Sequence, residues 1–429
     1  MRRAFRSTIV HCLADPGEHN ADAAWQCFDD GVLLVENGKV LEVGDAATLM
    51  PMLAGTADIQ DLSGKVLVPG FIDCHVHFPQ LDIIASYGEQ LLDWLNRYAY
   101  PQEQRFADEQ LAHEVAEVFV RELLNHGTTT ALVFGTVHAH SADAIFEAAE
   151  KRNMRLIAGK VLMDSNCPES LRDSATSGDR DSRDLIERWH GKGRLGYAIT
   201  PRFALTCSEQ QLELAGKLAQ EYPDVWVHTH LAENKSEVQA IAAQFPWSDS
   251  YLDVYDHFGL VRERSVFAHC LYLGDHDRQC MSSQGAAAAF CPSSNFFLGS
   301  GLLDLRALRE AGIRTGLATD VGGGTSLSML RTMSNAYKAL HLQKQPLPPM
   351  RALYLATLGA AEALYLQDRI GNFVAGKEAD FVVLDPAGSS ITERRCKAAE
   401  TIEELLFALI VLGDDRNVAT SYLQGEPAQ

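Results

Sequence analysis

A small set of histidines and carboxylates stands out in this sequence because of residue type and spacing. His75 and His77 are separated by one residue in PGFIDCHVHFPQ (69–80), at the end of an apolar run. Alternate residues of a β-strand point to the same face, so we expect these two imidazoles to project together as a candidate metal pair. Taken alone, an H-x-H pair is a weak signal, because two buried core histidines give the same pattern.

Further metal-binding and acid–base residues close later apolar runs. His228 and His230 end one run, Glu233 follows three residues after His230, and His269 and Asp320 end two other runs. Three imidazoles and one carboxylate suit zinc or ferrous iron, whereas calcium and magnesium prefer a cage of oxygen ligands. Such an ion would lower the pKa of a water to about 7, and Glu233 could carry a proton between that water and a substrate.

Several of these residues also have a simpler structural explanation. His228 shares the inward face of His230 but lies one layer deeper, so we expect it to be a packed core histidine. Asp320 could cap a helix after GGGT, a common position for aspartate. By default Phe203 is a core aromatic residue and Arg202 a surface charge. Their place in TPRF, at the end of an apolar run, makes them candidates for a pocket.

The middle of the chain alternates short β-rich runs with helical patterns, an order typical of a parallel sheet covered by helices. Eight such runs occur, at 65–73, 128–135, 155–163, 195–203, 224–231, 265–270, 286–292 and 313–320. We predict an α/β fold with a (β/α)8 TIM-like barrel, because polar residues cluster at the C-terminal ends of the runs. A doubly wound open sheet is the alternative, but no G-x-G-x-x-G or G-K-[ST] motif follows the first run.

Two β segments with a different pattern flank this region. Residues 31–44 alternate apolar and polar residues around Asn37-Gly38, a strong hairpin signal, and residues 376–386 predict a turn followed by a strand. We therefore predict a small β-sandwich domain built from both termini, comprising residues 1–64 and 366–429. The barrel domain is expected to cover residues 65–365.

The composition is that of an ordinary globular protein. The 429 residues are 46% hydrophobic and 22% charged, with a formal net charge of −20. Because this charge repels a phosphate backbone and no Lys/Arg cluster offsets it, we expect no nucleic-acid partner. The apolar run LLFALIVL (405–412) is far shorter than the ~20 residues of a membrane span, so we expect a buried helix or strand there and no membrane association.

The N-terminus and the cysteines indicate the compartment. The first residues contain only a short, broken apolar stretch, which does not match a secretory signal. The nine cysteines are odd in number and show no C-x-x-C spacing, which argues against both a disulfide framework and a cysteine-based zinc site. We expect a cytoplasmic protein with reduced thiols.

Several stretches of the sequence, taken together, resemble the metal-dependent amidohydrolase superfamily. They are PGFIDCHVH, HTHLAEN, FAHC, CPSSNFFLGSG and LATDVGGG, and the resemblance covers essentially the whole chain. Within this superfamily the chain resembles the guanine deaminases, through HFPQ (77–80), YGEQLLDWLNRYAYPQE (87–103), GTTTALVFGTVH (127–138) and PRFAL (201–205).

This resemblance implies a metal site and a reaction. One zinc ion per subunit, or alternatively ferrous iron, would be held by His75, His77, His230 and Asp320. The implied reaction is the hydrolytic deamination of guanine to xanthine and ammonia, in purine catabolism or salvage. In this reaction, Glu233 would protonate the ring and His269 would form a hydrogen bond with the attacking hydroxide. Asp320 would take the proton of that hydroxide.

The same resemblance implies a small purine base as the partner molecule. The implied substrate-binding residues are Gln80, Arg202, Phe203, Glu233, His269 and Asp320. Phe203 offers a face for stacking, Arg202 offers a fork of donors for O6 and N7, and Gln80 offers both a donor and an acceptor. A homodimer is likewise expected only from the resemblance.

Two other functions are compatible with the same residues. The metal site could serve another aminohydrolase, acting on adenosine-type nucleosides or on triazines, and Gln80, Arg202 and Phe203 would separate these activities. A scaffold protein that kept the barrel and lost catalysis is an alternative of a different class. It predicts missing ligands, whereas all four ligand residues and Glu233 are present in this sequence.

Overall fold

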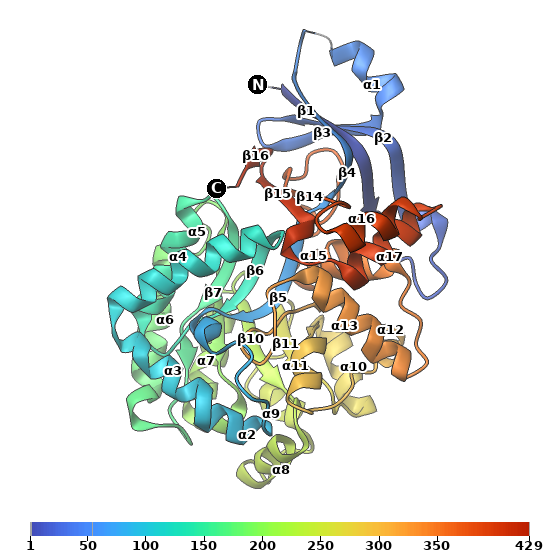
Figure 1. Ribbon diagram of the computed structural model, residues 1–429. Coiled ribbons are helices and arrows are strands. Elements are labelled where there is room, and N and C mark those ends of the chain that lie inside the picture. The colour runs from blue at the N-terminus through green and yellow to red at the C-terminus, as the bar shows by residue number, and fades with distance from the viewer. Residues whose placement is uncertain (1, 54, 429) are drawn as a thin grey trace. The chain divides into compact units, whose positions relative to one another are not determined.

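A nearly closed barrel of eight parallel strands carries the candidate site residues (Figure 1). The computed structural model describes residues 2–53 and 55–428. The barrel strands are β5 (Phe71–His77), β6 (Thr128–Phe134), β7 (Arg155–Gly159), β9 (Leu195–Pro201), β10 (Trp226–Leu231), β11 (Ser265–His269), β12 (Ala287–Phe290) and β13 (Thr315–Leu317). They lie side by side in chain order, and the short β8 (Val161–Leu162) pairs with β9 outside this order.

Burial explains why these strands read as apolar runs. Every residue of β5, β6, β7 and β9 is buried, as expected for parallel strands that are covered on both faces. Backbone hydrogen bonds join the end of β5 to the segment that follows β13. Asp320 N donates to His75 O at 2.9 Å, and His77 N donates to Val321 O at 2.8 Å. The first and last strands of the barrel therefore meet at the candidate metal ligands.

Helices follow the strands and pack outside the barrel. In Figure 1, α5 (Ala139–Lys151), α6 (Ala175–Trp189) and α7 (Glu209–Glu221) lie next to one another outside β7 and β9. The others in this part of the chain are α2 (Leu91–Trp94), the π-helical turn η3 (Leu95–Ala99), α3 (Tyr100–Gln104), α4 (Glu109–Asn125), α8 (Lys235–Gln244), α9 (Tyr251–His257), α10 (Asp275–Gln284), α11 (Pro292–Phe297) and α12 (Leu305–Glu310). Side chains cap many of these helices: Ser174 accepts from Ser177 N, and Ser208 accepts from Gln211 N.

The two ends of the chain build a seven-stranded mixed sheet. Its strands, in spatial order, are β16 (Glu426–Pro427), β15 (Val418–Leu423), β14 (Phe381–Leu384), β4 (Asp58–Pro69), β1 (Arg2–Cys12), β2 (Trp25–Glu36) and β3 (Lys39–Asp45). β1 is parallel to β4, and its other neighbour β2 is antiparallel to it. The rings of Phe5, Phe381 and Tyr422 pack together in its core, with centroids 4.4 to 5.1 Å apart.

The predicted hairpin around Asn37-Gly38 is confirmed. β2 and β3 are antiparallel, and the two turn residues have φ values of +53° and +76°. An Asn-Gly pair tolerates positive φ at both positions, which is what a two-residue hairpin turn requires. The helices of this part of the chain are α1 (Ala46–Leu53), α13 (Met329–Leu342), α14 (Pro349–Ala356), α15 (Leu358–Ala363), α16 (Ser390–Lys397) and α17 (Ile402–Leu412).

The predicted barrel is confirmed, and the β domain predicted from both termini, expected as a β-sandwich, is one seven-stranded mixed sheet. The first predicted strand of the barrel is corrected. The sequence predicts one strand over 65–73, but β4 ends at Pro69 and β5 begins at Phe71. The apolar run continues through both strands, so its composition hides the break between them. The other seven predicted runs each overlap a barrel strand.

Contacts divide the chain into two compact units. The first comprises Met1–Asp73, Arg121–Thr130 and Ser328–Gln429, and the second comprises Cys74–Val120 and Ala131–Leu327. The predicted domain boundaries at 64/65 and 365/366 stay a prediction. LLFALIVL lies within α17, and none of the described helices has the length and apolarity needed to cross a bilayer.

Candidate active site

Four predicted metal ligands converge at the C-terminal end of the barrel. His75 and His77 lie on β5, His230 lies on β10, and Asp320 follows β13. The Nε2 atom of His77 lies 3.1 Å from His75 Nε2 and 3.2 Å from His230 Nε2. Asp320 Oδ1 lies 3.1 Å from His75 Nε2 and 3.3 Å from His77 Nε2. Residues up to 245 positions apart therefore present their ligand atoms to one point.

The spacing and chemistry of this cluster fit a divalent metal ion. Ligand atoms bound tetrahedrally to zinc at about 2.0–2.1 Å lie roughly 3.3 Å apart, close to the distances found here. Burial is the main cause that lowers the pKa of His77 to about 3 and holds the pKa of His75 and His230 below the usual range. The imidazoles are therefore neutral, and neutral imidazole is the form that binds metal.

Neighbouring groups orient the imidazoles from behind. His230 Nδ1 donates to the carbonyl oxygen of Arg202 at 2.6 Å, which leaves the Nε2 lone pair facing the cluster. His75 Nδ1 lies 2.7 Å from Nε2 of His228, which is fully buried behind it. The prediction of a packed histidine at 228 therefore agrees with its position.

His269 lies beside the four ligand residues. Its Nδ1 donates to Asn295 Oδ1 at 3.0 Å. Its Nε2 lies 3.4 Å from Glu233 Oε2 and 3.6 Å from Asp320 Oδ2. One ligand atom each of His75, His230, His269 and Asp320 lies within 4.8 Å of the others. His269 can thus touch a group bound between Glu233 and Asp320. Asn295 lies in CPSSNFFLGSG, a stretch used for the resemblance, and no role was predicted for it from the sequence.

Glu233 is held by the first turn of α8. Its backbone N–H donates to Glu237 Oε2 at 2.8 Å, and the same oxygen accepts from Asn234 N at 3.0 Å. Asn234 in turn caps α8 by accepting from Ser236 N. Glu233 is 3% exposed. Burial, followed by the charges of Asp320 and Glu237, raises its pKa well above the usual range, so it can carry a proton.

Asp320 does not cap a helix. α13 begins at Met329, and the side chain that caps it belongs to Ser328. The helix-cap explanation of Asp320 is therefore wrong. The residue has φ +51°, and its carboxylate points at the imidazoles of His75 and His77. A positive φ is uncommon for residues other than glycine, and aspartate is among those that adopt it most readily.

Arg202 is a buried side chain, and its default assignment as a surface charge is wrong. Its Nη1 donates to Glu103 Oε2 at 2.6 Å, and both side chains are 2% exposed. The guanidinium also lies 5.2 Å from the ring centroid of Tyr100. Gln80 Nε2 donates to the other oxygen of Glu103 at 2.8 Å, and Gln80 Oε1 accepts from Gly322 N at 3.1 Å.

Glu103 was not singled out by the sequence analysis. It is separated from Arg202 by 99 residues, so no local spacing connects the two. The only available signal was its place at the end of YGEQLLDWLNRYAYPQE, a stretch used for the resemblance. The structure adds it to the site as the shared acceptor of Arg202 and Gln80.

A pocket with an empty volume of about 390 Å³ opens beside the cluster. Its apolar wall is formed by Leu91, Trp94, Leu95, Phe203 and Leu298. Of the nine predicted site residues, His77, Gln80, Arg202, Phe203, His230, Glu233 and Asp320 line it, and His75 and His269 lie behind this lining, in contact with Asp320. A mostly apolar cleft with a few convergent polar groups is typical of a small-molecule site.

Comparison with known proteins identifies the family. Residues 66–428 match the amidohydrolase family. The chain is 47% identical to the guanine deaminase of Escherichia coli (strain K12) over 94% of its own length and 92% of that protein. It is 39% identical to a probable guanine deaminase of Deinococcus radiodurans, covering 99% of this chain and 98% of that one.

Solved structures agree with this assignment. The structure of E. coli guanine deaminase superposes with a TM-score of 0.97 at 45% identity, covering 100% of this chain and 99% of that one. The guanine deaminase of C. acetobutylicum with bound guanine gives a TM-score of 0.92 at 26% identity, with complete coverage of both chains. The match to the amidohydrolase family and the similarity to guanine deaminases indicate a hydrolase acting on C–N bonds. The chain belongs to the amidohydrolase family.

Proposed function

We propose that this protein is a metal-dependent guanine deaminase that converts guanine and water to xanthine and ammonia. The observation that carries the proposal is the arrangement of Arg202 and Gln80 on Glu103, next to a histidine–carboxylate cluster. The similarity to guanine deaminases over nearly the whole chain supports the same activity.

The proposed metal is one zinc ion per subunit, with ferrous iron as an alternative. His75, His77, His230 and Asp320 would hold it, because their ligand atoms have the spacing of a tetrahedral site. When bound, such an ion lowers the pKa of a water to about 7 and so supplies a nucleophile at neutral pH.

In the proposed reaction, side chains of the protein carry out the proton transfers. Glu233, whose carboxyl group is buried and has a raised pKa, would protonate a ring nitrogen of guanine as C2 is attacked. Asp320 would accept the proton of the attacking water. His269, with its Nε2 near both carboxylates, would orient the attacking oxygen. The amino group then takes the proton held by Asp320 and leaves C2 as ammonia, while the new hydroxyl group at C2 returns a proton to Glu233, so that xanthine remains.

The hydrogen-bond arrangement favours guanine over adenine-type substrates. Since Glu103 takes one N–H from Arg202 and one from Gln80, the Gln80 amide must turn its oxygen toward Gly322 N. The polar groups that Arg202 and Gln80 still have available for a substrate are mainly N–H donors. Guanine presents two acceptors, O6 and N7, on one edge, whereas adenine presents the N6 amino donor in place of O6. Phe203 would stack on the purine.

The test is ammonia release from guanine, adenine, cytosine, a triazine and 2,6-diaminopurine at matched concentrations. We expect the highest kcat/KM on guanine. 2,6-Diaminopurine differs at position 6, where an amino group replaces O6, and we expect at least about 100-fold lower kcat/KM for it. The highest activity on adenine or a triazine would contradict the proposal in favour of the alternative aminohydrolases. A pure protein inactive on all five after zinc or iron is added would favour a scaffold.

We also propose the cellular setting of this activity. By similarity to guanine deaminases, the chain would act as a cytoplasmic homodimer in purine catabolism or salvage, without a nucleic-acid or membrane partner. All nine cysteines are free thiols, which agrees with a reducing compartment. Light scattering of the purified protein tests the dimer, and fractionation of the cells that make it tests the compartment.

A further inference from the structure

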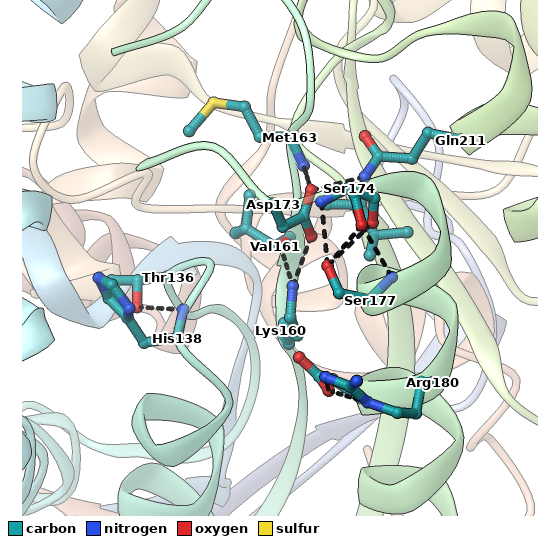
Figure 2. Close-up of polar contacts among 12 residues, drawn as sticks. Thr136, His138, Lys160, Val161, Met163, Asp173, Ser174, Ser177, Arg180 and Gln211 are labelled. Carbon is teal, nitrogen blue, oxygen red and sulfur yellow. Dashed lines mark hydrogen bonds and ion pairs between the residues drawn. The ribbon is translucent and has the colours of Figure 1, made fainter. Parts of the chain in front are cut away.

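A buried ion pair lies outside the pocket at the C-terminal end of β7. Lys160 Nζ lies 2.6 Å from Asp173 Oδ2, and the two side chains are 1% and 9% exposed (Figure 2). Burying an ammonium group is costly unless a carboxylate stays in place to pair with it. Neither residue lines the pocket, and the proposed reaction uses neither of them.

The carboxylate of Asp173 fixes a short length of backbone. Its Oδ1 accepts from Gln211 Nε2 on α7 at 2.7 Å and from Met163 N at 3.3 Å. Lys160 Nζ also donates to Val161 O at 3.2 Å, as Figure 2 shows. On its other side, Val161 N donates to the carbonyl oxygen of Thr136, at 2.9 Å. Residues 161–163, which contain β8, are therefore held from several directions.

β8 in turn holds the backbone that carries Arg202. β8 is parallel to the end of β9, with Val161 opposite Thr200 and Leu162 opposite Pro201. The carbonyl oxygen of Leu162 accepts from Arg202 N at 3.1 Å. The carbonyl oxygen of Arg202 accepts from His230 Nδ1. The backbone of Arg202 is thus fixed between β8 and a predicted metal ligand.

We propose that Lys160 and Asp173 are positioning residues that hold Arg202 and Phe203 at the pocket through β8. The proposal rests on the proposed function, because it gives the pair a role in guanine binding. Without the carboxylate charge, β8 would lose its anchor and the Arg202 side chain would shift relative to the purine. Small misplacements of a binding group are costly even when the group itself is intact.

The first test is Asp173→Asn in the metal-loaded, full-length protein. This change keeps the shape of the side chain and removes its charge. We expect KM for guanine to rise roughly tenfold while kcat changes less than about threefold, with unchanged metal content. Lys160→Met should likewise raise KM with little change in kcat. Lys160→Arg, which retains a cation, should have a KM close to that of the wild type.

Asp143→Asn is the matched control. Asp143 on α5 accepts from Arg188 Nη1 at 2.6 Å and from Trp189 Nε1 at 2.7 Å, so it also anchors α6 through an ion pair. These bonds reach neither β8 nor the pocket. We expect this variant to lose thermal stability and to keep the wild-type KM.

Hydrogen exchange of the substrate-free protein gives a readout that does not depend on activity. We expect Asp173→Asn to speed exchange of the amides of Thr200, Arg202 and Phe203, and Asp143→Asn to leave them unchanged. Wild-type KM and exchange in Asp173→Asn, or equal changes in Asp143→Asn, would overturn the positioning role. If the wild-type protein failed to deaminate guanine, the proposed function would fall, and the exchange result would still decide whether Asp173 holds Arg202.

Discussion

Glu103 accepts a hydrogen bond from Arg202 Nη1 at 2.6 Å, deep in the barrel unit where both side chains are 2% exposed. The other oxygen of Glu103 accepts from Gln80 Nε2 at 2.8 Å. One buried carboxylate therefore orients the side chains of both Arg202 and Gln80, which are proposed to form hydrogen bonds with the substrate. This carboxylate neutralises the buried charge of Arg202 and sets the orientation of the Gln80 amide.

Replacing Glu103 with glutamine should damage both stability and substrate binding. The change leaves Arg202 as a buried cation without its partner, which costs about 3 kcal/mol or more in such pairs. We expect kcat/KM for guanine to fall at least about 100-fold, measured by ammonia release, and the melting temperature to drop. Glu150→Gln, in an exposed pair with Lys192, should change neither quantity measurably.

Replacing Arg202 with lysine should affect guanine use more than folding. Lysine retains the positive charge for Glu103, but a compact ammonium cannot reproduce a planar fork of donors. We expect KM for guanine to rise at least about tenfold with little change in the urea unfolding midpoint. Unchanged kinetics would mean that Arg202 does not contact the substrate.

Replacing Glu233 with glutamine should separate metal binding from turnover. The amide has nearly the same shape as the carboxyl group but cannot transfer a proton. We expect kcat to fall by about 10²–10⁴-fold while metal content, measured by elemental analysis, stays at the wild-type level. The matched control is Glu213→Gln on α7, where the carboxylate is exposed and pairs with Lys217. An active Glu233→Gln protein would show that another group moves the proton.

Removing the metal should lower activity and stability together. The four ligand residues come from β5, β10 and the segment after β13, so a bound ion cross-links distant parts of the barrel. Because an ion that binds only the folded state stabilises it, chelator treatment should lower the melting temperature and abolish ammonia release. Zinc or ferrous iron should restore both, and His77→Ala should remain inactive after either is added. Full activity in metal-free protein would contradict the proposed site.

The stability of the protein should decrease in mild acid because of His11. Burial lowers the pKa of His11 from 6.5 to about 4, and its Nδ1 accepts from Phe373 N at 3.3 Å. Below pH 6.5 the unfolded chain takes up a proton that the folded chain refuses until about pH 4, so the free energy of unfolding falls across this window.

The loss in the free energy of unfolding that is caused by His11 reaches about 3 kcal/mol by pH 4. Urea unfolding at pH 7 and pH 5 should show a smaller loss for His11→Gln than for the wild type. His113→Gln, at a residue that is partly exposed on α4, should lose as much stability as the wild type. A wild-type pH dependence in His11→Gln would contradict this assignment.

The sequence alone determined the architecture, because the alternation of apolar runs and helices repeats along the chain. It predicted the barrel, the hairpin at Asn37-Gly38 and the β region from both termini. It also predicted which residues gather at the site, since parallel strands of a barrel end on the same face. That rule brings His75, His77, His230, His269 and Asp320 to one face, whereas the choice of four expected metal ligands among them came from the resemblance to the guanine deaminases.

Only the tertiary structure showed which residues that are far apart in the sequence contact one another. The pairing of Glu103 with Arg202, the turning of the Gln80 amide and the link from Asp173 through β8 join segments with no common local pattern. The break between β4 and β5 was also hidden, because one apolar run serves both strands. Hydrophobic periodicity specifies which face of an element is buried, whereas the partner of a buried charge is fixed only when the elements pack.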